Sequence, residues 1–315
     1  MSNTNVLDWL TPPRTFSSVD VKDFIHFEIP PRENILTPWL PQQGLAMIYA
    51  SRGIGKTFIA LGIAHAVVTG TSFLKWSAPK PRGVLYLDGE MPASLMQERL
   101  KMIFQAGEIT ANVPFRLLTP DMQEAAMPDL TQQSDQAQLE PFLDDIGLII
   151  IDNISTLCRS GKENDADAWI PVQDWALRMR ASGRSVLFIH HAGKGGMQRG
   201  TSKREDVLDT VISLQQSEDY DAKEGASFEI HFEKARGFYG IDAESFKARL
   251  QTCAQNGMRW ETAPITSTTF DKILEMTQQG RQQQEIARML NIHKSNVSRH
   301  IARAKSEGKL RGCVT

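Results

Sequence analysis

The sequence predicts an α/β protein with a mostly parallel sheet, followed by a small all-α domain at the C-terminus. From about residue 34 to 261, short apolar runs alternate with longer amphipathic stretches. This pattern is typical of βαβ units, in which helices cover parallel strands. After residue 265 short helical patterns replace the apolar runs. We therefore divide the chain into an N-terminal arm or linker over 1–33, a core over 34–262 and a C-terminal domain over 268–315.

Five apolar runs are the expected parallel strands: GLAMIYA, GVLYLDG, IGLIIID, RSVLFIHH and DTVISL. The run SFEIHFEKA follows them and is expected to close the sheet as an antiparallel edge. Residues 120–138 are polar and predict a surface loop, and TAPITSTT is the expected connector to the C-terminal domain.

The composition indicates the class of the protein and the cellular compartment in which it works. The chain has 315 residues, of which 41% are hydrophobic and 23% charged, as in ordinary globular proteins. No apolar run reaches the roughly 20 residues of a membrane span, and the N-terminus lacks the pattern of a signal peptide. The three cysteines have no metal-binding spacing, which favours a reducing compartment. We expect a cytoplasmic protein without a membrane partner.

A glycine-rich turn, ASRGIGKTF, joins the first strand to an apolar helix. Backbone N–H groups and the helix dipole at such a turn favour a phosphate. Gly53 and Gly55 allow a backbone geometry that a Cβ would obstruct. Lys56 can reach the β- and γ-phosphates of a nucleotide, and the Thr57 hydroxyl can bind Mg²⁺. The turn therefore predicts a site for ATP and Mg²⁺.

The turn departs from the strict pattern G-x-x-x-x-G-K-[ST] at its first position, where Ala50 stands. Alanine has the smallest side chain with a Cβ, so it fits if its φ is negative. The strand before and the helix after favour a phosphate-binding loop over a chance glycine-rich turn. The residues expected to bind the nucleotide are Ser51, Arg52, Gly53, Ile54, Gly55, Lys56, Thr57 and Phe58.

Acidic residues end two further strands. Asp152 follows the run IGLIII, where its carboxylate can orient the water shell of Mg²⁺ beside Thr57. The segment GVLYLDGEM places Asp88 and Glu90 at the end of another strand. Hydrolysis needs a base or a water-positioning group that faces the γ-phosphate, and Glu90 is the candidate. The alternative is that Glu90 caps the helix PASLMQERL.

Two histidines, His190 and His191, end the strand SVLFIHH. A neutral histidine can donate a hydrogen bond to a γ-phosphate and so report its loss. Adjacent side chains on a strand point to opposite faces, so we expect one of the two to face the nucleotide. A purely structural role remains the alternative for each histidine.

In this order, the segments ASRGIGKT, LYLDGEM, LIIIDN, VLFIHHAGKGG and QRGTSKREDVLD resemble the RecA-like ATPases, and most closely the hexameric RepA-type replicative helicases of plasmids and mobile elements. The resemblance spans roughly residues 34–261 and lies in the order of the motifs. It implies a RecA-like P-loop ATPase core and a homo-oligomer, most simply a hexamer. It also implies Glu90 as the catalytic carboxylate, Asp152 as the second acidic motif and His191, rather than His190, as the γ-phosphate sensor.

The same resemblance implies roles for four basic residues. Arg199, in the segment QRG, matches an arginine that such ATPases insert into a neighbouring subunit's site; a contact with DNA is the alternative. Lys234 and Arg236, in FEKARGFYG, resemble a Lys-x-Arg pair that also crosses the subunit interface. For Arg236 the alternative is a surface ion pair with Glu233. The glycine-rich loop that contains Lys194 resembles a loop that contacts single-stranded DNA.

The C-terminal tail departs from the short RepA helicases. Residues 265–315 carry nine Lys and Arg against four Asp and Glu, whereas the rest of the chain is net negative. A basic tail on an acidic body is expected to meet a polyanion. Gly280 separates a first helix from QQEIARML, and the turn NIH precedes a third helix that starts at Lys294. This pattern predicts a helix-turn-helix, similar to the small winged-helix domains of bacterial regulators.

The third helix is expected to present its N-terminal half to duplex DNA. Asn can pair with adenine and Arg with guanine, while Lys and Ser suit phosphates. The expected DNA-binding residues of the tail are Lys294, Ser295, Asn296, Ser298, Arg299 and Arg303. A protein-binding three-helix cap is the alternative.

The interpretation is an ATP-dependent DNA translocase or helicase that works as a ring in the replication of a plasmid or mobile element. Two alternatives remain open. One is a DNA-bound ATPase switch, a regulator or loader that does not unwind DNA. The other is the ATPase of a recombination or repair filament.

Overall fold

The computed structural model describes residues 17–104, 113–159, 167–193, 202–216, 225–252, 258–265, 269–290, 292–306 and 308–310. The chain divides into two units, Met1–Arg32 and Glu33–Thr315. In the described part of the first unit, Asp20 caps the short helix α1 (Val21–Phe24) by accepting a hydrogen bond from the Lys22 N–H at 2.8 Å. Helix α1 buries none of its residues.

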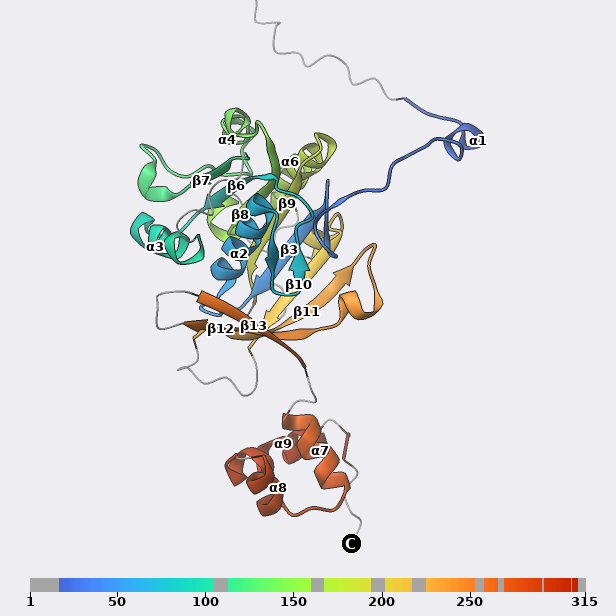
Figure 1. The fold of residues 1–315 in the computed structure, drawn as a ribbon, viewed down its shortest axis with the longest axis vertical. Helices are drawn as coiled ribbons and strands as arrows, with labels where there is room; N and C mark the ends of the chain where they lie inside the picture. Colours follow the sequence, from blue (N-terminus) through green and yellow to red (C-terminus); the bar gives the residue numbers. More distant parts are fainter. Residues whose placement is uncertain are drawn as a thin grey trace, which may run out of the picture. The chain divides into compact units, whose positions relative to one another are not determined.

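A nine-stranded sheet organises the second unit, with strand order β13-β12-β11-β10-β3-β9-β8-β6-β7 (Figure 1). Its strands are β3 (Leu45–Ala50), β6 (Gly83–Asp88), β7 (Phe115–Leu118), β8 (Ile146–Asp152), β9 (Ser185–His191), β10 (Thr210–Gln215), β11 (Ser227–Ala235), β12 (Phe246–Thr252) and β13 (Met258–Pro264). Strands β10, β3, β9, β8, β6 and β7 pair in parallel, and β11, β12 and β13 continue the sheet as antiparallel neighbours.

This sheet confirms the predicted α/β class, the five parallel strands and the antiparallel edge. Three strands of this sheet were not predicted: β7, β12 and β13. Strand β13 takes in the first residues of TAPITSTT, the expected connector, because their backbone pairs with β12 from Phe246 onwards. Residues 120–138 are largely irregular, as expected for a loop, with two single helical turns.

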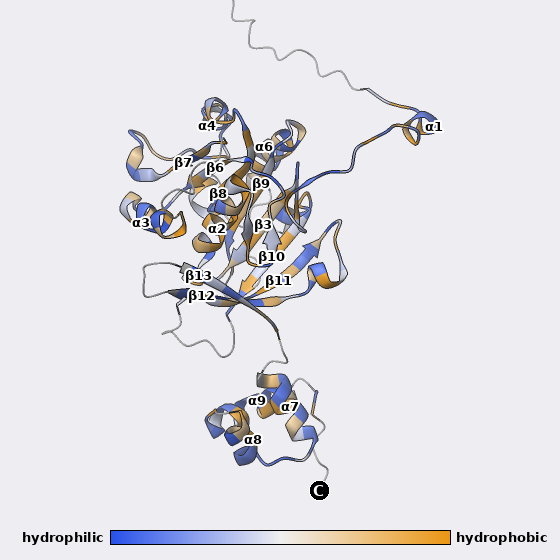
Figure 2. Ribbon diagram, in the orientation of Figure 1, coloured by the Kyte–Doolittle hydropathy of each residue, from blue (hydrophilic) through white to orange (hydrophobic). Residues whose placement is uncertain are grey.

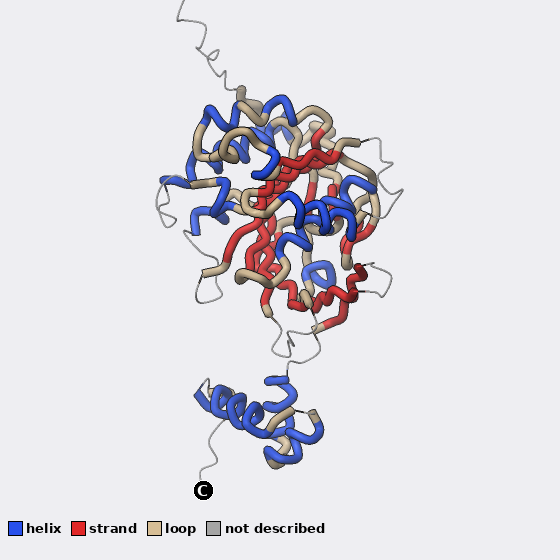
Figure 3. The backbone as a smooth tube through the Cα atoms, turned by 90° about the vertical axis from the view of Figure 1, so that its left-hand side faces the viewer, coloured by secondary structure: helices blue, strands red, loops and turns tan. Residues whose placement is uncertain are grey.

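Helices cover both faces of the sheet, which is why the central strands are apolar on both sides. Helices α2 (Lys56–Thr69) and α3 (Ala93–Ile103) pack on one face, and α5 (Ile154–Leu157) and α6 (Ile170–Ala181) on the other. Figure 3 shows helices, in blue, on either side of the red strands. In Figure 2 much of the hydrophobic colouring falls on the central strands, whereas outer helices carry both colours.

The remaining elements of the core are short. They are the strands β1 (Asn34–Leu36), β2 (Leu40–Pro41), β4 (Ser72–Phe73) and β5 (Trp76–Ser77), the helix α4 (Gln133–Ala137), and the 3₁₀ turns η1 (Pro120–Met122), η2 (Glu140–Phe142), η3 (Asp167–Trp169), η4 (Ser202–Glu205) and η6 (Gly240–Ala243). In the described part of the chain, no helix combines the length and apolarity that a membrane span requires.

The C-terminal residues fold as three helices with a small core of their own. They are α7 (Thr269–Gln278), α8 (Gln283–Met289) and α9 (Lys294–Ser306). The buried core residues are Ile273, Ile286, Ala287, Val297 and Ile301. Gly280 follows α7 with a φ of +79°, which ends the helix at the predicted place. The all-α character of this region, here called the three-helix unit (residues 269–310), agrees with the sequence prediction.

Candidate active site

The phosphate loop, residues 51–55, lies between the end of β3 and the start of α2. Ala50 is the last residue of β3 and is buried in extended backbone, so the Cβ that departs from the strict pattern causes no strain. Gly53 and Gly55 have φ values of +77° and +113°. A Cβ at Gly55 would lie 3.1 Å from the Cβ of Ala226. Glycine is therefore favoured at Gly55 by its backbone angle and by the close approach of Ala226, just before β11.

The ammonium group of Lys56 is held against the loop. Its Nζ donates hydrogen bonds to the carbonyl oxygens of Ala50 at 3.1 Å and Ser51 at 2.8 Å. The side chain is buried, and this burial lowers the pKa of Lys56, while the charges of Asp152 and Glu90 act in the opposite direction. Electrostatic interaction thus links Lys56 with Asp152 at the end of β8 and with Glu90 just after β6.

Asp152 ends β8 as a buried carboxylate with two hydroxyl partners. The Tyr86 hydroxyl donates to its Oδ2 at 2.6 Å, and the Thr57 side chain also forms a hydrogen bond with it. Burial raises the pKa of Asp152 to about 6, and both hydrogen bonds oppose this rise. The structure therefore brings Thr57 and Asp152 together, although they lie on different elements.

These two residues fit a magnesium ion. A carboxylate and a hydroxyl are hard oxygen donors, and Mg²⁺ is usually bound by one or two protein groups together with substrate phosphates. Within the described residues, no group of three or more His, Cys, Asp or Glu could hold a metal ion by itself. Thr57 and Asp152 would hold the ion together with a nucleotide.

Asp88 ends β6, and Glu90 follows it in a tight turn. Asp88 lies opposite Asp152 in the strand register and is buried. It accepts hydrogen bonds from Thr119 Oγ1 at 3.0 Å and from the backbone of Glu90 and Met91. Burial raises the pKa of Asp88. The Asp88 carboxylate therefore stabilises the turn after β6 through these hydrogen bonds.

Gly89 is the contact point between this turn and the end of β8. Its N–H donates to the Asp152 carbonyl at 2.7 Å, and a Cβ there would lie 2.1 Å from Thr156 Oγ1. The Glu90 side chain, next along the chain, is exposed, and its charge acts on Lys56 and Asp152.

The first turn of α3 is bound by Asp121 and not by Glu90. The Ala93 N–H donates to Asp121 Oδ2 at 2.8 Å, and the N-cap residue, Pro92, makes no side-chain cap hydrogen bond. The alternative that Glu90 serves as the helix cap therefore finds no support, and Glu90 stays a candidate for chemistry.

The two histidines at the end of β9 face opposite ways. Leu187 and Ile189 pack in the same cluster as α2, and side chains alternate along a strand, so His191 shares the α2 face. His191 lies beside Ala50 in the β3–β9 register. On the other face, His190 Nε2 lies 2.9 Å from Arg204 Nη1. Because arginine only donates, this ring nitrogen accepts, and His190 has a structural contact away from the phosphate loop.

Comparison with known proteins agrees with this geometry. A family described as an AAA domain matches residues 11–197. The chain belongs to the AAA domain family. The match covers the phosphate loop, Glu90, Asp152 and His191, and with the strand arrangement it shows a RecA-like P-loop NTPase fold. It ends before β11 and the three-helix unit.

Two similar solved structures are archaeal. The flagellar accessory protein FlaH from Methanocaldococcus jannaschii is 13% identical, with a TM-score of 0.48, and the alignment covers 71% of this chain and 91% of that one. The KaiC-like protein PH0186 from Pyrococcus horikoshii OT3 is 14% identical, with a TM-score of 0.49 and coverage of 73% and 99%. No curated protein matches the chain.

Lys234 and Arg236 lie at the far end of the sheet from the phosphate loop of the AAA domain. Ala235 pairs with Thr210, which in turn pairs with Ala46 near the start of β3. The phosphate loop follows the opposite end of β3, about 13 Å along the strand. The two basic residues are therefore remote from the nucleotide site of their own chain.

The contacts of these basic residues differ. Lys234 is half-buried and donates to the Glu205 carbonyl, and its burial and the charge of Arg236 lower its pKa. The Arg236 side chain is exposed. Glu233, the proposed ion-pair partner of Arg236, instead accepts a hydrogen bond from Ser213 at 2.8 Å. No ion pair joins Arg236 to another residue in the described ranges. Arg199 and Lys194 lie outside the described residues.

Helix α9 presents most of the expected DNA-binding side chains to solvent. Lys294, Ser295, Ser298 and Arg299 are exposed, and Asn296 is half-buried. Arg303 is exposed too, but its guanidinium lies 4.8 Å from the centre of the Phe270 ring. Arg303 therefore packs on α7 as well as facing solvent, a contact that the helical pattern of α9 alone does not reveal.

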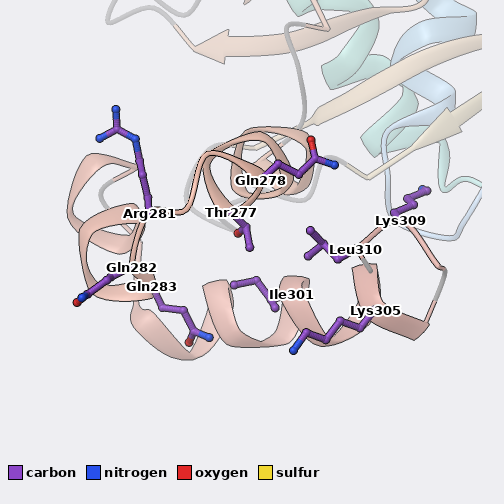
Figure 4. A pocket seen from close by; sticks show the side chains of 9 residues that line it. All are labelled: Thr277, Gln278, Arg281, Gln282, Gln283, Ile301, Lys305, Lys309 and Leu310. Atoms are coloured by element: carbon purple, nitrogen blue, oxygen red, sulfur yellow. The ribbon is translucent and has the colours of Figure 1, made fainter. Parts of the chain in front are cut away.

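A cavity of about 780 Å³ opens beside the C-terminal half of α9 (Figure 4). Its lining combines basic and amide side chains with two apolar ones: Thr277, Gln278, Arg281, Gln282, Gln283, Ile301, Lys305, Lys309 and Leu310. Arg281 pairs with Glu285 at 2.7 Å. The basic character of the three-helix unit thus extends beyond the predicted residues.

Sequence reasoning missed Tyr86 and Asp121. Tyr86 lies two residues before Asp88 in the segment GVLYLDG. Because side chains alternate along a strand, this spacing places both residues on the α2 face, and it could have identified Tyr86 as a site residue. Asp121 lies in the segment assigned to a surface loop, and its contact with Ala93 joins residues 28 apart in sequence. No local pattern reveals such a contact.

Proposed function

We propose that this protein is an ATP-dependent DNA translocase or helicase, working in the cytoplasm as a ring of identical subunits in the replication of a plasmid or mobile element. The observation that carries the ATPase part is the meeting of Lys56, Thr57, Asp152 and Glu90 at the carboxyl ends of the parallel strands. The DNA part is supported by the exposed basic face of α9.

Each residue of the site has a separate role in the hydrolysis of ATP. The backbone N–H groups of the phosphate loop hold the phosphates, and Lys56 neutralises charge at the β- and γ-positions. Bound through Thr57 and Asp152, Mg²⁺ would offset the charge that develops during phosphoryl transfer. Glu90 orients the attacking water and accepts its proton. His191 lies on the same face and donates to the γ-phosphate until that group leaves.

Arg236 completes this site from a neighbouring subunit. An arginine that arrives only on assembly stabilises the dispersed charge of the transition state. Within one chain Arg236 lies at the opposite end of β3 from the phosphate loop, so a second copy must supply it. Lys234, two residues earlier on β11, lies at the same interface. Arg199 either joins them or contacts DNA.

DNA meets two parts of the chain in this proposal. The three-helix unit acts as a helix-turn-helix and docks α9 on duplex DNA, with Lys294 and Arg299 as leading contacts. The loop that contains Lys194 contacts single-stranded DNA. The exposure of Lys294 and Arg299 above a separate small core supports the first contact.

A strand-displacement assay tests the proposal. A forked duplex with one labelled strand is incubated with the protein, Mg²⁺ and ATP, and Lys56→Ala protein serves as the control. The proposal expects hydrolysis-dependent release of the labelled strand by the unaltered protein alone. DNA-stimulated hydrolysis without release would support the ATPase switch instead. Electron micrographs with an ATP analogue and single-stranded DNA separate closed rings from the open filament of a repair ATPase.

A further inference from the structure

The cavity beside the C-terminal half of α9 takes no part in the proposed function. Its volume of about 780 Å³ is that of a small-molecule site, since such sites in proteins typically measure roughly 300–1,000 Å³. All three helices contribute to its lining, with Thr277 from α7, Gln283 from α8 and Ile301 from α9. A ligand in the cavity would therefore contact the whole three-helix unit.

The floor of the cavity is apolar. Ile301 is buried in the core of the unit, and Leu310 packs against that core. In Figure 4 the side chains of Thr277, Ile301 and Leu310 point toward one another across the cavity. An apolar group placed on this floor would be removed from water, which is favourable in proportion to the area buried.

Cationic side chains surround the floor. Arg281, Lys305 and Lys309 line the cavity, and none of the described residues in its lining is acidic. The ammonium group of Lys309 lies 5.1 Å from the centre of the Phe270 ring, a cation–π contact that holds it at the edge of the cavity. The glutamine side chains of the lining add neutral N–H donors. This edge favours an anionic group.

Two acidic residues reduce the positive charge without cancelling it. Glu285 pairs with Arg281 at 2.7 Å, and the two side chains are 50% and 37% exposed. An exposed ion pair of this kind is weak, and the guanidinium has further N–H donors for a ligand. Glu307 stands between Lys305 and Lys309 in the sequence but lies outside the described residues. Even with both carboxylates counted, the three cations leave a net positive charge.

The cavity is separate from the part of α9 that the proposal assigns to duplex DNA. Arg299 is exposed and lies about 200° around the helix from Ile301, so it points away from the cavity. Lys294 lies about 10 Å along the helix axis from Ile301. A ligand in the cavity therefore leaves these two side chains accessible.

We infer that this cavity binds a small organic anion with an apolar body. The apolar body lies on Ile301 and Leu310, and the anionic group accepts hydrogen bonds from Arg281, Lys305 and Lys309. The inference goes beyond the proposed function and depends neither on ATP hydrolysis nor on DNA binding.

Displacement of a fluorescent anion tests the inference on the full chain. The probe is anilinonaphthalene sulfonate, which joins a sulfonate to aromatic rings and fluoresces more strongly in apolar surroundings. Octanoate is the competitor, and acetate, inorganic phosphate and octanol are its controls. Octanoate should displace the probe at concentrations at least about tenfold lower than any of the controls, because it alone meets both the apolar floor and the cationic edge.

Variants locate the site. Lys305→Gln with Lys309→Gln should weaken octanoate binding by at least about tenfold, since two charged hydrogen-bond donors are lost. Lys80→Gln with Lys101→Gln makes the same change in charge on two exposed lysines of the core and is the matched control. Lys305→Arg keeps the charge and should bind octanoate as the unaltered protein does.

Equal octanoate affinities in the two double variants would overturn the inference, as would displacement by acetate or octanol at the concentrations at which octanoate acts. Displacement by a short DNA duplex as effective as that by octanoate would assign the cavity to the DNA interface and overturn it too. Circular dichroism checks that each variant is folded.

A second variant keeps the test decisive if Lys305→Gln with Lys309→Gln does not fold. Leu310→Gln removes part of the apolar floor and keeps every charge. It should weaken octanoate binding and leave the weak effect of acetate unchanged. Unaltered octanoate binding in Leu310→Gln would contradict the inference.

Discussion

The candidate nucleotide site of the core and the candidate DNA-binding face of α9 are built in opposite ways. At the nucleotide edge, Asp88 and Asp152 are buried and each is held by hydroxyl groups from other elements. On α9, Lys294 and Arg299 are exposed on one helix above a small core. The first site depends on packing across several strands, whereas the second depends on the charge of one surface. Substitutions should therefore affect the first site sharply and the second gradually.

The largest effect is expected at Lys56. Lys56→Ala should abolish ATP hydrolysis, because the backbone N–H groups of the phosphate loop cannot replace a positive charge at the β- and γ-phosphates. Lys80→Ala is the control, since Lys80 is an exposed lysine paired with Glu33 at 2.6 Å. Phosphate release at saturating Mg²⁺ and ATP is the measurement. Full turnover in Lys56→Ala would refute the assignment of the phosphate loop.

Glu90→Gln should slow hydrolysis by about 10²–10⁴-fold while nucleotide binding stays intact. The amide keeps the shape of the side chain and loses the basicity that accepts a proton. Single-turnover hydrolysis separates this step from binding, and Glu98→Gln, a change on the neighbouring helix α3, is the control. Normal hydrolysis in Glu90→Gln together with loss in Asp88→Asn would exchange the roles of the two acids.

Tyr86→Phe should weaken the response to Mg²⁺ by about 10–100-fold, because the Tyr86 hydroxyl orients the carboxylate of Asp152. The readout is the Mg²⁺ concentration that gives half of the thermal stabilisation by ATP. Tyr49→Phe is the matched control, since this buried tyrosine of β3 interacts with Ser213 and Glu233, and its burial raises its pKa to about 12. Equal responses in the two variants would show that the loss of any buried hydroxyl has this effect.

Deletion of residues 266–315 should leave ATP hydrolysis within about twofold of the full chain, because all nine strands of the main sheet and the nucleotide residues lie upstream. Binding to duplex DNA should fall, most strongly at low salt, where phosphate contacts dominate affinity. Fluorescence anisotropy over a salt series measures both effects. If duplex binding survives the deletion, the three-helix unit has another task, such as protein docking.

A single substitution in α9 tests the contribution of one side chain to duplex DNA binding. Arg299→Ala should weaken duplex binding by about tenfold if the arginine contacts a base, with loss of sequence preference. A uniform weakening with a shallower salt dependence would indicate a phosphate contact. Arg281→Ala is the control, because Arg281 is paired with Glu285. The comparison between the two regions fails if Arg299→Ala alters ATP hydrolysis and leaves DNA binding unchanged.

The sequence predicted local features well and long-range features poorly. The phosphate loop, the acid that ends β8 and the three helices of the tail were predicted because each lies in one continuous segment with its own pattern. Strands β7, β12 and β13 were missed because they are short or contain many polar residues, and pairing with neighbours defines them.

The contacts that refine the candidate site were also beyond local patterns. The hydrogen bond between Tyr86 and Asp152 joins residues 66 apart, and the contact of Arg303 with Phe270 joins two helices. The distance of Arg236 from the phosphate loop follows from the strand order, which the sequence does not state. Periodicity predicts which face a side chain takes, but it does not predict which neighbour that face meets.

The most direct test of the whole account mixes two inactive proteins. Lys56→Ala lacks the phosphate-loop lysine and Arg236→Ala lacks the arginine, so each alone should hydrolyse almost no ATP on single-stranded DNA. In mixed assemblies, some interfaces pair an intact phosphate loop with an intact Arg236. The account predicts that hydrolysis partly recovers on mixing and peaks at an intermediate ratio. No recovery at any ratio, with subunit exchange confirmed by fluorescence, would contradict a site shared between two copies.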